Sequence, residues 1–288
     1  MQDSFRGNST YFLREPMHAP LSNNQERLVY EPQHNNKGLI HMFYTQPHVI
    51  QKQIAKLLGI ISVILLSIAS STLQALTYTI PKTGNQIGQI EEIPAKAGDT
   101  LASIAERFSI GQQAMREANP TLKNMKLKQG TLVTIPSVFY LPVSAPRQGL
   151  VVNLSEMRAY YYHPDTQLVS TYPLCVGRKG WATPRGTTKV VSKEANPDWN
   201  PPASIKAEAK ANGHPLPDWV APGPHNPLGR YAIHLGIPGI LIHGTTAPSS
   251  VGQRSSHGCM RMYALDLEEL FNHISVGEVV HLIDETHP

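Results

Sequence analysis

The sequence predicts a mostly β protein: a β-sandwich or partial barrel over residues 148–284, preceded by a small α+β unit at residues 91–136. From residue 149 onward, apolar and polar residues alternate with a period of two, which is typical of half-buried strands. Residues 91–136 instead fit the order strand, helix, helix, strand. Two prolines in residues 137–147 predict a linker between the two domains.

Composition excludes several classes of protein. The 288 residues include 25 Lys and Arg against 21 Asp and Glu, a net charge of +4. So small an excess argues against a nucleic-acid-binding protein, because such proteins carry clustered Lys and Arg. It suits a partner that carries carboxylates. The two cysteines, Cys175 and Cys259, exclude a disulfide framework, a four-cysteine zinc site and a four-cysteine iron–sulfur cluster.

An apolar run at residues 57–69 follows Lys52 and Lys56 and ends in small or polar residues. This order is typical of a signal peptide, which we place at residues 51–76. The run is shorter than the ~20 residues needed to span a bilayer unaided. Because the segment is interpreted as a signal peptide, the protein is expected to be exported. An uncleaved signal anchor and a buried core helix are the alternatives.

Residues 1–50 are polar, which is unusual ahead of a signal peptide. We interpret them as a disordered or non-native extension. Met42 lies shortly before the basic residues of the predicted signal, so translation is expected to start there.

The α+β unit at residues 91–136 is predicted in detail. Asp99 or Thr100 is placed to cap the first helix. Residues spaced three and four apart give that helix one apolar face: Leu101, Ile104, Ala105 and Phe108. A second helix ends at Asn119 and Pro120, and a strand follows Gly130. The pattern GDTLxxIAxRF, ANP and GTLVTIP resembles a LysM module, which implies binding to the N-acetylglucosamine-containing glycan of peptidoglycan or chitin.

The second domain is predicted to be largely antiparallel, with few helices. One amphipathic helix is expected over residues 263–274. Strands are expected at residues 149–154, 158–162, 168–176, 187–192, 230–235, 240–243 and 278–283.

The alternating pattern is lost in the proline-rich residues 196–227. A loop this long inside a compact domain is usually functional, so we interpret it as a lid. Trp199 and Trp219 lie within it and Trp181 lies beside it. These aromatic side chains are expected to form a wall over a pocket. The alternative is a small hydrophobic core that only tethers the loop.

Two short motifs carry the chemistry: Ile242-His243-Gly244-Thr245 and, further on, Ser256-His257-Gly258-Cys259-Met260-Arg261. A cysteine nucleophile needs a base to take its proton and groups that stabilise the thiolate. His243 ends a predicted strand, which is a rigid place for a base. Gly258 allows a sharp turn at Cys259, where backbone N–H groups can stabilise an oxyanion. Arg261 is placed to bind a substrate carboxylate.

Together with YYYHP, TPRGTTKV and APGPHNPLGRYAIHLG, these motifs resemble the YkuD-type L,D-transpeptidase catalytic domain, and within it the ErfK/YbiS/YcfS/YnhG group of Gram-negative enzymes. The resemblance implies a YkuD-like β-sandwich in which Cys259 is the nucleophile and His243 the proton acceptor. It implies that the Gly244 carbonyl orients His243. The expected substrate-binding residues are His257, Arg261, Ser256, Gly258, Trp199 and Trp219.

The resemblance also implies a reaction in the periplasm of a Gram-negative bacterium. The donor is a peptidoglycan tetrapeptide stem, which forms a thioester and releases D-alanine. The acceptor is an amine: that of another stem, giving a 3→3 cross-link, or a lysine of an outer-membrane lipoprotein. No cofactor and no metal are implied, and carbapenem β-lactams are the expected inhibitors. The alternatives are an L,D-carboxypeptidase, which transfers to water, and a non-catalytic peptidoglycan-binding protein.

Two further interpretations of the same residue types stay open. The side chains of His234, His243, His257 and Cys259 are compatible with a zinc site. Cys175 lies between Leu174 and Val176 on a predicted strand, so it is expected in the core rather than as a redox partner of Cys259.

Overall fold

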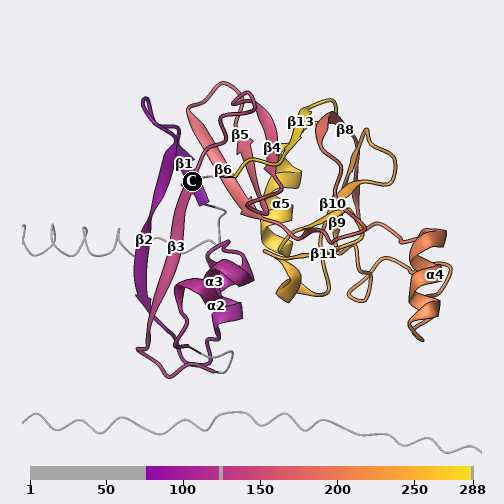
Figure 1. Cartoon of the computed structure of the whole chain (residues 1–288), viewed down its shortest axis with the longest axis horizontal. Helices are drawn as coiled ribbons and strands as arrows, with labels where there is room; N and C mark the ends of the chain where they lie inside the picture. The colour runs from indigo at the N-terminus through magenta and orange to yellow at the C-terminus, as the bar shows by residue number, and fades with distance from the viewer. Residues whose placement is uncertain (1–75, 123–125, 287–288) are drawn as a thin grey trace, which may run out of the picture. The chain divides into compact units, whose positions relative to one another are not determined.

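The computed structural model describes residues 76–122 and 126–286 (Figure 1). The predicted extension at residues 1–50 lies outside these residues. So does the predicted signal segment, except for Leu76, which begins strand β1 (Leu76–Thr79). Within the described part of the chain, no helix has the length and apolar character needed to cross a membrane.

The N-terminal unit has the predicted order of elements. Strands β2 (Gln86–Pro94) and β3 (Leu132–Tyr140) form an antiparallel pair, and helices α2 (Leu101–Arg107) and α3 (Gln112–Ala118) lie between them in the sequence. The predicted linker at residues 137–147 is partly wrong, because β3 continues to Tyr140, where it pairs with Gln86. Ladder hydrogen bonds to β2 thus extend the strand past Pro136, which the sequence had suggested as its end.

Of the two candidate caps of α2, the structure selects Thr100. Its Oγ1 accepts a 3.0 Å hydrogen bond from the Ser103 backbone N–H, and the Ser103 Oγ accepts one of 2.9 Å from the Thr100 N–H. This reciprocal pair satisfies two backbone donors of the first turn. Asp99 instead accepts hydrogen bonds of 2.9 and 2.8 Å from the Arg107 guanidinium at the other end of the same helix.

The second domain is mostly β, as predicted. Its main sheet has nine strands in the order β1-β6-β5-β4-β13-β8-β9-β10-β12. Two pairs are parallel, β13 with β4 and β10 with β12, and the other neighbours are antiparallel. The strands are β4 (Gly149–Asn153), β5 (Arg158–Tyr162), β6 (Leu168–Pro173), β8 (Gly186–Ala195), β9 (Tyr231–Leu235), β10 (Leu241–His243), β12 (Met260–Arg261) and β13 (Val279–Ile283).

Besides the main sheet, this domain contains a helix after β12, a 3₁₀ helix (Pro248–Ser250), a separate pair of strands and a helix in the predicted lid. Helix α5 (Ala264–His273) directly follows β12. Strands β7 (Val176–Gly177) and β11 (Arg254–Ser256) form a separate parallel pair. Helix α5 places Leu267 and Leu270 in a core that also contains alternate residues of the sheet, such as Leu150 and Tyr161.

The other face of the same strands is buried by the N-terminal unit. Val151 and Tyr160 lie in a second core with Ile104 of α2 and Met115 of α3. Every residue of β4 and β5 is therefore buried, although successive side chains point to opposite faces. The two domains therefore share the second core, on one face of the sheet.

The predicted lid at residues 196–227 contains a helix that the sequence analysis missed, α4 (Ala203–Ala211). Pro202 stands at its N-cap, and no residue of α4 is buried. Proline is tolerated at the start of a helix, where an N–H has no partner in the helix. Because α4 has no apolar stripe, periodicity could not reveal it.

Candidate active site

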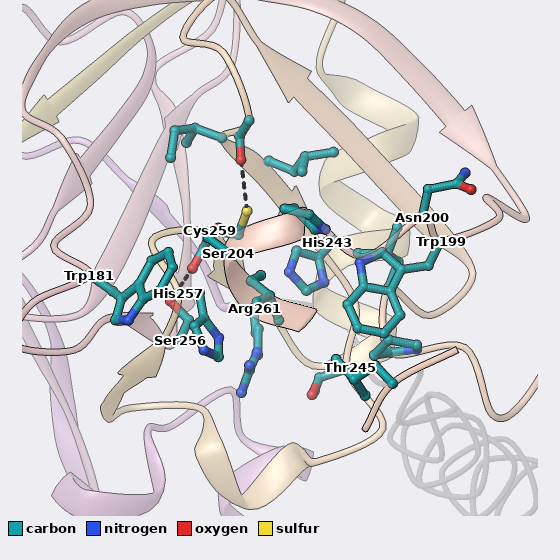
Figure 2. Close-up of a pocket in the computed structure, with 18 of the residues that line it drawn as sticks. Trp181, Trp199, Asn200, Ser204, His243, Thr245, Ser256, His257, Cys259 and Arg261 are labelled. Carbon is teal, nitrogen blue, oxygen red and sulfur yellow. Dashed lines mark hydrogen bonds between the residues drawn. The ribbon is translucent and has the colours of Figure 1, made fainter. Parts of the chain in front are cut away.

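A cavity of about 980 Å³ lies where β9, β10 and β12 meet the lid. Residues of all four segments line it, with Cys259, His243 and Arg261 among them (Figure 2). The lid contributes Trp199, and also Ile205 and Glu208 from helix α4. The motifs that the sequence analysis singled out therefore meet at one cavity.

The register of two short parallel strands explains how Cys259 and His243 come together. Ile242 pairs with Met260 and His243 with Arg261. Ile242 and Met260 are fully buried in the core, so the alternation of side chains turns His243 and Arg261 to the opposite face. Cys259 precedes Met260 and shares that face, where Figure 2 shows it beside His243.

His243 is held as a neutral imidazole. Its Nδ1 donates a 2.7 Å hydrogen bond to the Gly244 carbonyl, which leaves Nε2 as a proton acceptor. Burial, with a smaller effect from the positive charge of Arg261, lowers the pKa of His243 to about 4, although backbone hydrogen bonds at Gly244 and Pro227 act in the opposite direction. At neutral pH the ring is therefore uncharged, as a general base must be.

Cys259 is held chiefly as a thiol. Burial raises its pKa, while a backbone hydrogen bond at Leu241 and the charge of Arg261 act in the opposite direction. Its Sγ lies 3.3 Å from the Gly239 carbonyl oxygen, to which the thiol donates. A raised cysteine pKa beside a lowered histidine pKa gives a neutral thiol and imidazole at rest, so the proton has to move when the sulfur attacks.

Ser256 and Gly258 shape the turn that presents Cys259. The Ser256 Oγ donates a 2.5 Å hydrogen bond to the Cys259 carbonyl and accepts one of 3.2 Å from the Gly258 N–H. Gly258 has φ +104°, a conformation that favours glycine. Ser256 lines the cavity as predicted, but Gly258 does not. In the structure Gly258 serves the turn, and its carbonyl accepts a hydrogen bond from Thr183; substrate binding by Gly258 stays a prediction.

Arg261 presents a cation to the cavity. None of the ion pairs formed among residues 76–122 and 126–286 involves it. Its backbone is fixed by Cys175, because the two residues exchange N–H···O hydrogen bonds of 2.9 and 3.0 Å. Cys175 itself is fully buried, as predicted, with its Sγ 3.2 Å from the Ser255 hydroxyl.

The two tryptophans of the lid lie in different environments. Trp199 lines the cavity, as predicted. Trp219 does not line the cavity: the residue is 54% exposed, and its indole N–H donates a 2.6 Å hydrogen bond to Asp198. The second aromatic wall is Trp181, whose ring meets that of His257 edge to face at 4.9 Å. Backbone hydrogen bonds between Trp199 and Val220 turn the lid so that Trp219 faces solvent.

The residues of the zinc hypothesis make other contacts. His234 lies 3.5 Å from the Glu194 carboxylate, and His257 lies 2.8 Å from that of Glu208. In the described residues, no group of three or more His, Cys, Asp or Glu side chains is arranged to hold a metal ion.

Comparison with known proteins fits both domains. Residues 147–282 match the L,D-transpeptidase catalytic domain, YkuD, and residues 95–136 match the LysM domain. The probable L,D-transpeptidase YbiS of Escherichia coli (strain K12) is 41% identical over 219 residues, which are 75% of this chain and 71% of that protein. The chain belongs to the L,D-transpeptidase family.

Another relative and one solved structure are also similar to this L,D-transpeptidase. The probable L,D-transpeptidase ErfK/SrfK of Escherichia coli (strain K12) is 38% identical over 221 residues, 75% of this chain and 71% of that protein. Among solved structures, L,D-transpeptidase 3 from Mycobacterium tuberculosis aligns with a TM-score of 0.35 and 16% identity, over 72% of this chain and 98% of that one. As an L,D-transpeptidase with a LysM domain, the protein acts on peptidoglycan, and the LysM domain indicates binding to its glycan.

Two charged residues of the L,D-transpeptidase site were not predicted from the sequence. Arg178 and Glu208 both line the cavity, and their side chains form an ion pair. Arg178 directly follows the short strand β7, and Glu208 lies on α4. Neither belongs to a motif, so only the path of the lid brings them together.

Proposed function

We propose that this L,D-transpeptidase uses Cys259 as its nucleophile and His243 as its general base on a tetrapeptide stem of peptidoglycan. The observation that carries the proposal is the neutral His243, whose Nε2 is left as an acceptor by the hydrogen bond of Nδ1 to Gly244. Cys259 lies on the same face of the sheet, so the base and the thiol share one cavity.

In the first half-reaction, His243 Nε2 takes the proton of the Cys259 thiol as the sulfur attacks the carbonyl carbon of the third residue of the stem. Backbone N–H groups of the turn at Cys259 stabilise the oxyanion of the tetrahedral intermediate. The bond to the terminal D-alanine then breaks, and the imidazolium gives its proton to the leaving amine. The products are a thioester on Cys259 and free D-alanine.

In the second half-reaction, an acceptor amine attacks the thioester carbon. His243 takes the proton of the amine, a new amide bond forms and the Cys259 thiol is restored. Both acceptors implied by the sequence, the amine of a second stem and a lipoprotein lysine, suit this step. Water in their place would give the L,D-carboxypeptidase reaction on the same thioester.

Arg261 is proposed to bind a carboxylate of the donor. It lines the same cavity as Cys259 and makes no ion pair with a described side chain. A guanidinium favours planar, two-point contact with a carboxylate. A carbapenem, which carries a carboxylate beside an acylating carbonyl, is accordingly proposed as an inhibitor that acylates Cys259.

Intact-protein mass spectrometry after incubation with purified muropeptides tests the mechanism. We expect the mass of the enzyme to increase by that of the donor muropeptide less free D-alanine, as a thioester on Cys259, followed by cross-linked products when acceptor stems are present. Trimmed tripeptides without cross-links would support the carboxypeptidase alternative. Turnover without an adduct, even with short quench times, would contradict the thioester mechanism.

We propose that the protein is exported to the periplasm and processed before Leu76. The basic residues and apolar run of residues 51–76 support export. Cleavage after Ala75 would leave strand β1 whole and paired with β6. Sequencing the N-terminus of the periplasmic protein, made from Met1 or from Met42, tests both parts. A cytoplasmic, unprocessed product from both start sites would contradict export.

A further inference from the structure

Helix α4 of the lid is attached to the catalytic body through one carboxylate. Among the described side-chain hydrogen bonds and ion pairs, only those of Glu208 join α4 to residues outside the lid. Lys206, on the same helix, pairs instead with Asp218 of the lid at 2.7 Å. Because α4 buries none of its residues, this single carboxylate is its main polar attachment.

Two cationic or protonatable groups meet at the Glu208 carboxylate. Its Oε1 accepts a hydrogen bond from the Arg178 guanidinium, and its Oε2 lies 2.8 Å from His257 Nε2. Both contacts lower the pKa of Glu208, Arg178 more than His257. All three side chains are partly exposed and line the same cavity as Cys259. The carboxylate that they hold is therefore in contact with the substrate space.

Arg178 and His257 are placed by the body of the domain and not by the lid. The Arg178 backbone N–H donates a 3.0 Å hydrogen bond to the Ser256 carbonyl, beside His257. Trp181 packs against both side chains, with its ring 4.9 Å from that of His257 and 5.8 Å from the Arg178 guanidinium carbon. The pair would thus keep its position if Glu208 moved away.

We infer that Arg178 and His257 form a second carboxylate-binding subsite for the donor stem, which Glu208 of the lid occupies when no donor is bound. This inference rests on the proposed function, because it takes the stem as the donor. A stem peptide carries more than one carboxylate, and Arg261 accounts for one of them. Exchange of the Glu208 carboxylate for that of the stem releases α4 from Arg178 and His257 as the donor enters, and the lid then covers the bound stem. The lid's own carboxylate therefore competes with the substrate.

Binding measurements in a Cys259→Ala background test the inference without turnover. Calorimetry measures the affinity of a tetrapeptide stem for the Cys259→Ala protein and for the same protein with Glu208→Gln. The Gln substitution keeps the shape of the side chain and removes its charge. Freed of the competitor, the Gln variant is expected to bind the stem about three- to tenfold more tightly, because a larger fraction of the subsite is open. A stem whose carboxylates are amidated should show no such gain.

Two variants separate a subsite from a simple latch. Adding Arg178→Gln to Glu208→Gln should abolish the gain, since the guanidinium that binds the incoming carboxylate is then missing. Lys206→Ala is the matched control, because it removes an ion pair of the same helix that does not touch the cavity. Its affinity for the stem is expected to equal that of the parent.

The results that overturn the inference are equally definite. An unchanged or weaker affinity of Glu208→Gln for the acid stem, or an equal gain for the amidated stem, would show that Glu208 does not compete with a substrate carboxylate. Mass spectrometry of the enzyme with Cys259 intact keeps the two proposals apart. Acylation by the stem without a gain in Glu208→Gln refutes only the subsite, whereas binding without acylation refutes the thioester mechanism.

Discussion

The Oγ of Ser109 in the LysM domain donates a 2.6 Å hydrogen bond to Oδ1 of Asp266 on helix α5 of the catalytic domain. Both residues are buried. Arg158 of β5, also buried, donates a 3.1 Å hydrogen bond to the Ser109 carbonyl. These contacts lie in the interior that the two domains share, so the LysM domain is fixed against the catalytic sheet. Glycan bound to it would be held in a defined position relative to the sheet.

Replacing Asp266 with Asn should change how stability depends on pH. Burial raises the pKa of Asp266 to about 7, above its ordinary value of 3.8. The folded state therefore binds more protons than the unfolded state between about pH 4 and pH 7, and the unfolding free energy falls as the pH rises through this window. Above it, Asp266→Asn should be more stable than the parent by roughly 2–4 kcal/mol.

Urea unfolding of both proteins at pH 4.5 and pH 8 measures this difference. Asn retains an oxygen that accepts from Ser109, so only the titration is removed. Ser109→Ala is the matched control, because it removes the hydrogen bond and leaves the carboxyl group in place. A difference between parent and Asp266→Asn that stays constant from pH 4.5 to pH 8 would show that Asp266 does not titrate in this range.

The two cysteines should respond differently to substitution. Cys259→Ala is expected to abolish acylation by the donor, a loss of several orders of magnitude in rate. Cys175→Ser should keep most of the activity and lose some stability, because Cys175 is fully buried and acts on the site through its backbone bonds to Arg261. Turnover and thermal unfolding of both variants check this. An inactive but folded Cys175→Ser variant would point to a redox link between the cysteines.

The pH below which kcat/KM falls, the acid limit, should lie far below the ordinary pKa of histidine because His243 is the base. Because its pKa is lowered to about 4, the base stays unprotonated down to about pH 5, and kcat/KM should fall only as the pH approaches 4. His243→Gln should lose roughly 10²–10⁴ in kcat/KM. Its Cys259 should still react with iodoacetamide at high pH, where the thiol ionises by itself. An acid limit near pH 6.5 would show that His243 titrates as an ordinary histidine, and would contradict its lowered pKa.

Some of this architecture could be predicted from local sequence, and some depended on distant contacts. The strand at Arg158–Tyr162 was predicted with its observed bounds, because turns flank it and its residues favour strands. Its burial on both faces was not predicted, because that requires the LysM domain to cover one of them. The parallel pairing of β10 with β12 likewise follows from the fold of the whole sheet.

The residues of the site were likewise predicted only in part from local sequence. Cys259 and His243 could be found because short motifs carry them, and the structure places both at one cavity. Trp219 was predicted to form a wall of that cavity only because it lies with another tryptophan in a proline-rich segment. The turn of the lid points it to solvent. Glu208 and Arg178 were missed because they are distant in the sequence and meet only through α4, a helix without an apolar stripe.

Deleting residues 203–217, which include α4, should weaken donor binding more than it changes the intrinsic reactivity of Cys259. Cys259, His243 and Arg261 lie on β10, on β12 or beside them, and their backbone bonds do not involve the deleted residues. The deleted segment supplies Ile205 and Leu216 to the cavity. We expect the loss of these apolar contacts to outweigh the removal of the competing Glu208 carboxylate, so the apparent KM for the stem should rise.

The product should change as well, because a lid excludes water from the thioester and water competes with the acceptor amine. Chromatography of the products is expected to show fewer cross-linked stems and more trimmed tripeptides. Iodoacetamide labelling of Cys259 measures the reactivity of the thiol separately, and Lys206→Ala provides an intact lid with one altered ion pair. If labelling collapses together with turnover in the truncated enzyme, the segment supports the fold of the site, and its role as a lid is refuted.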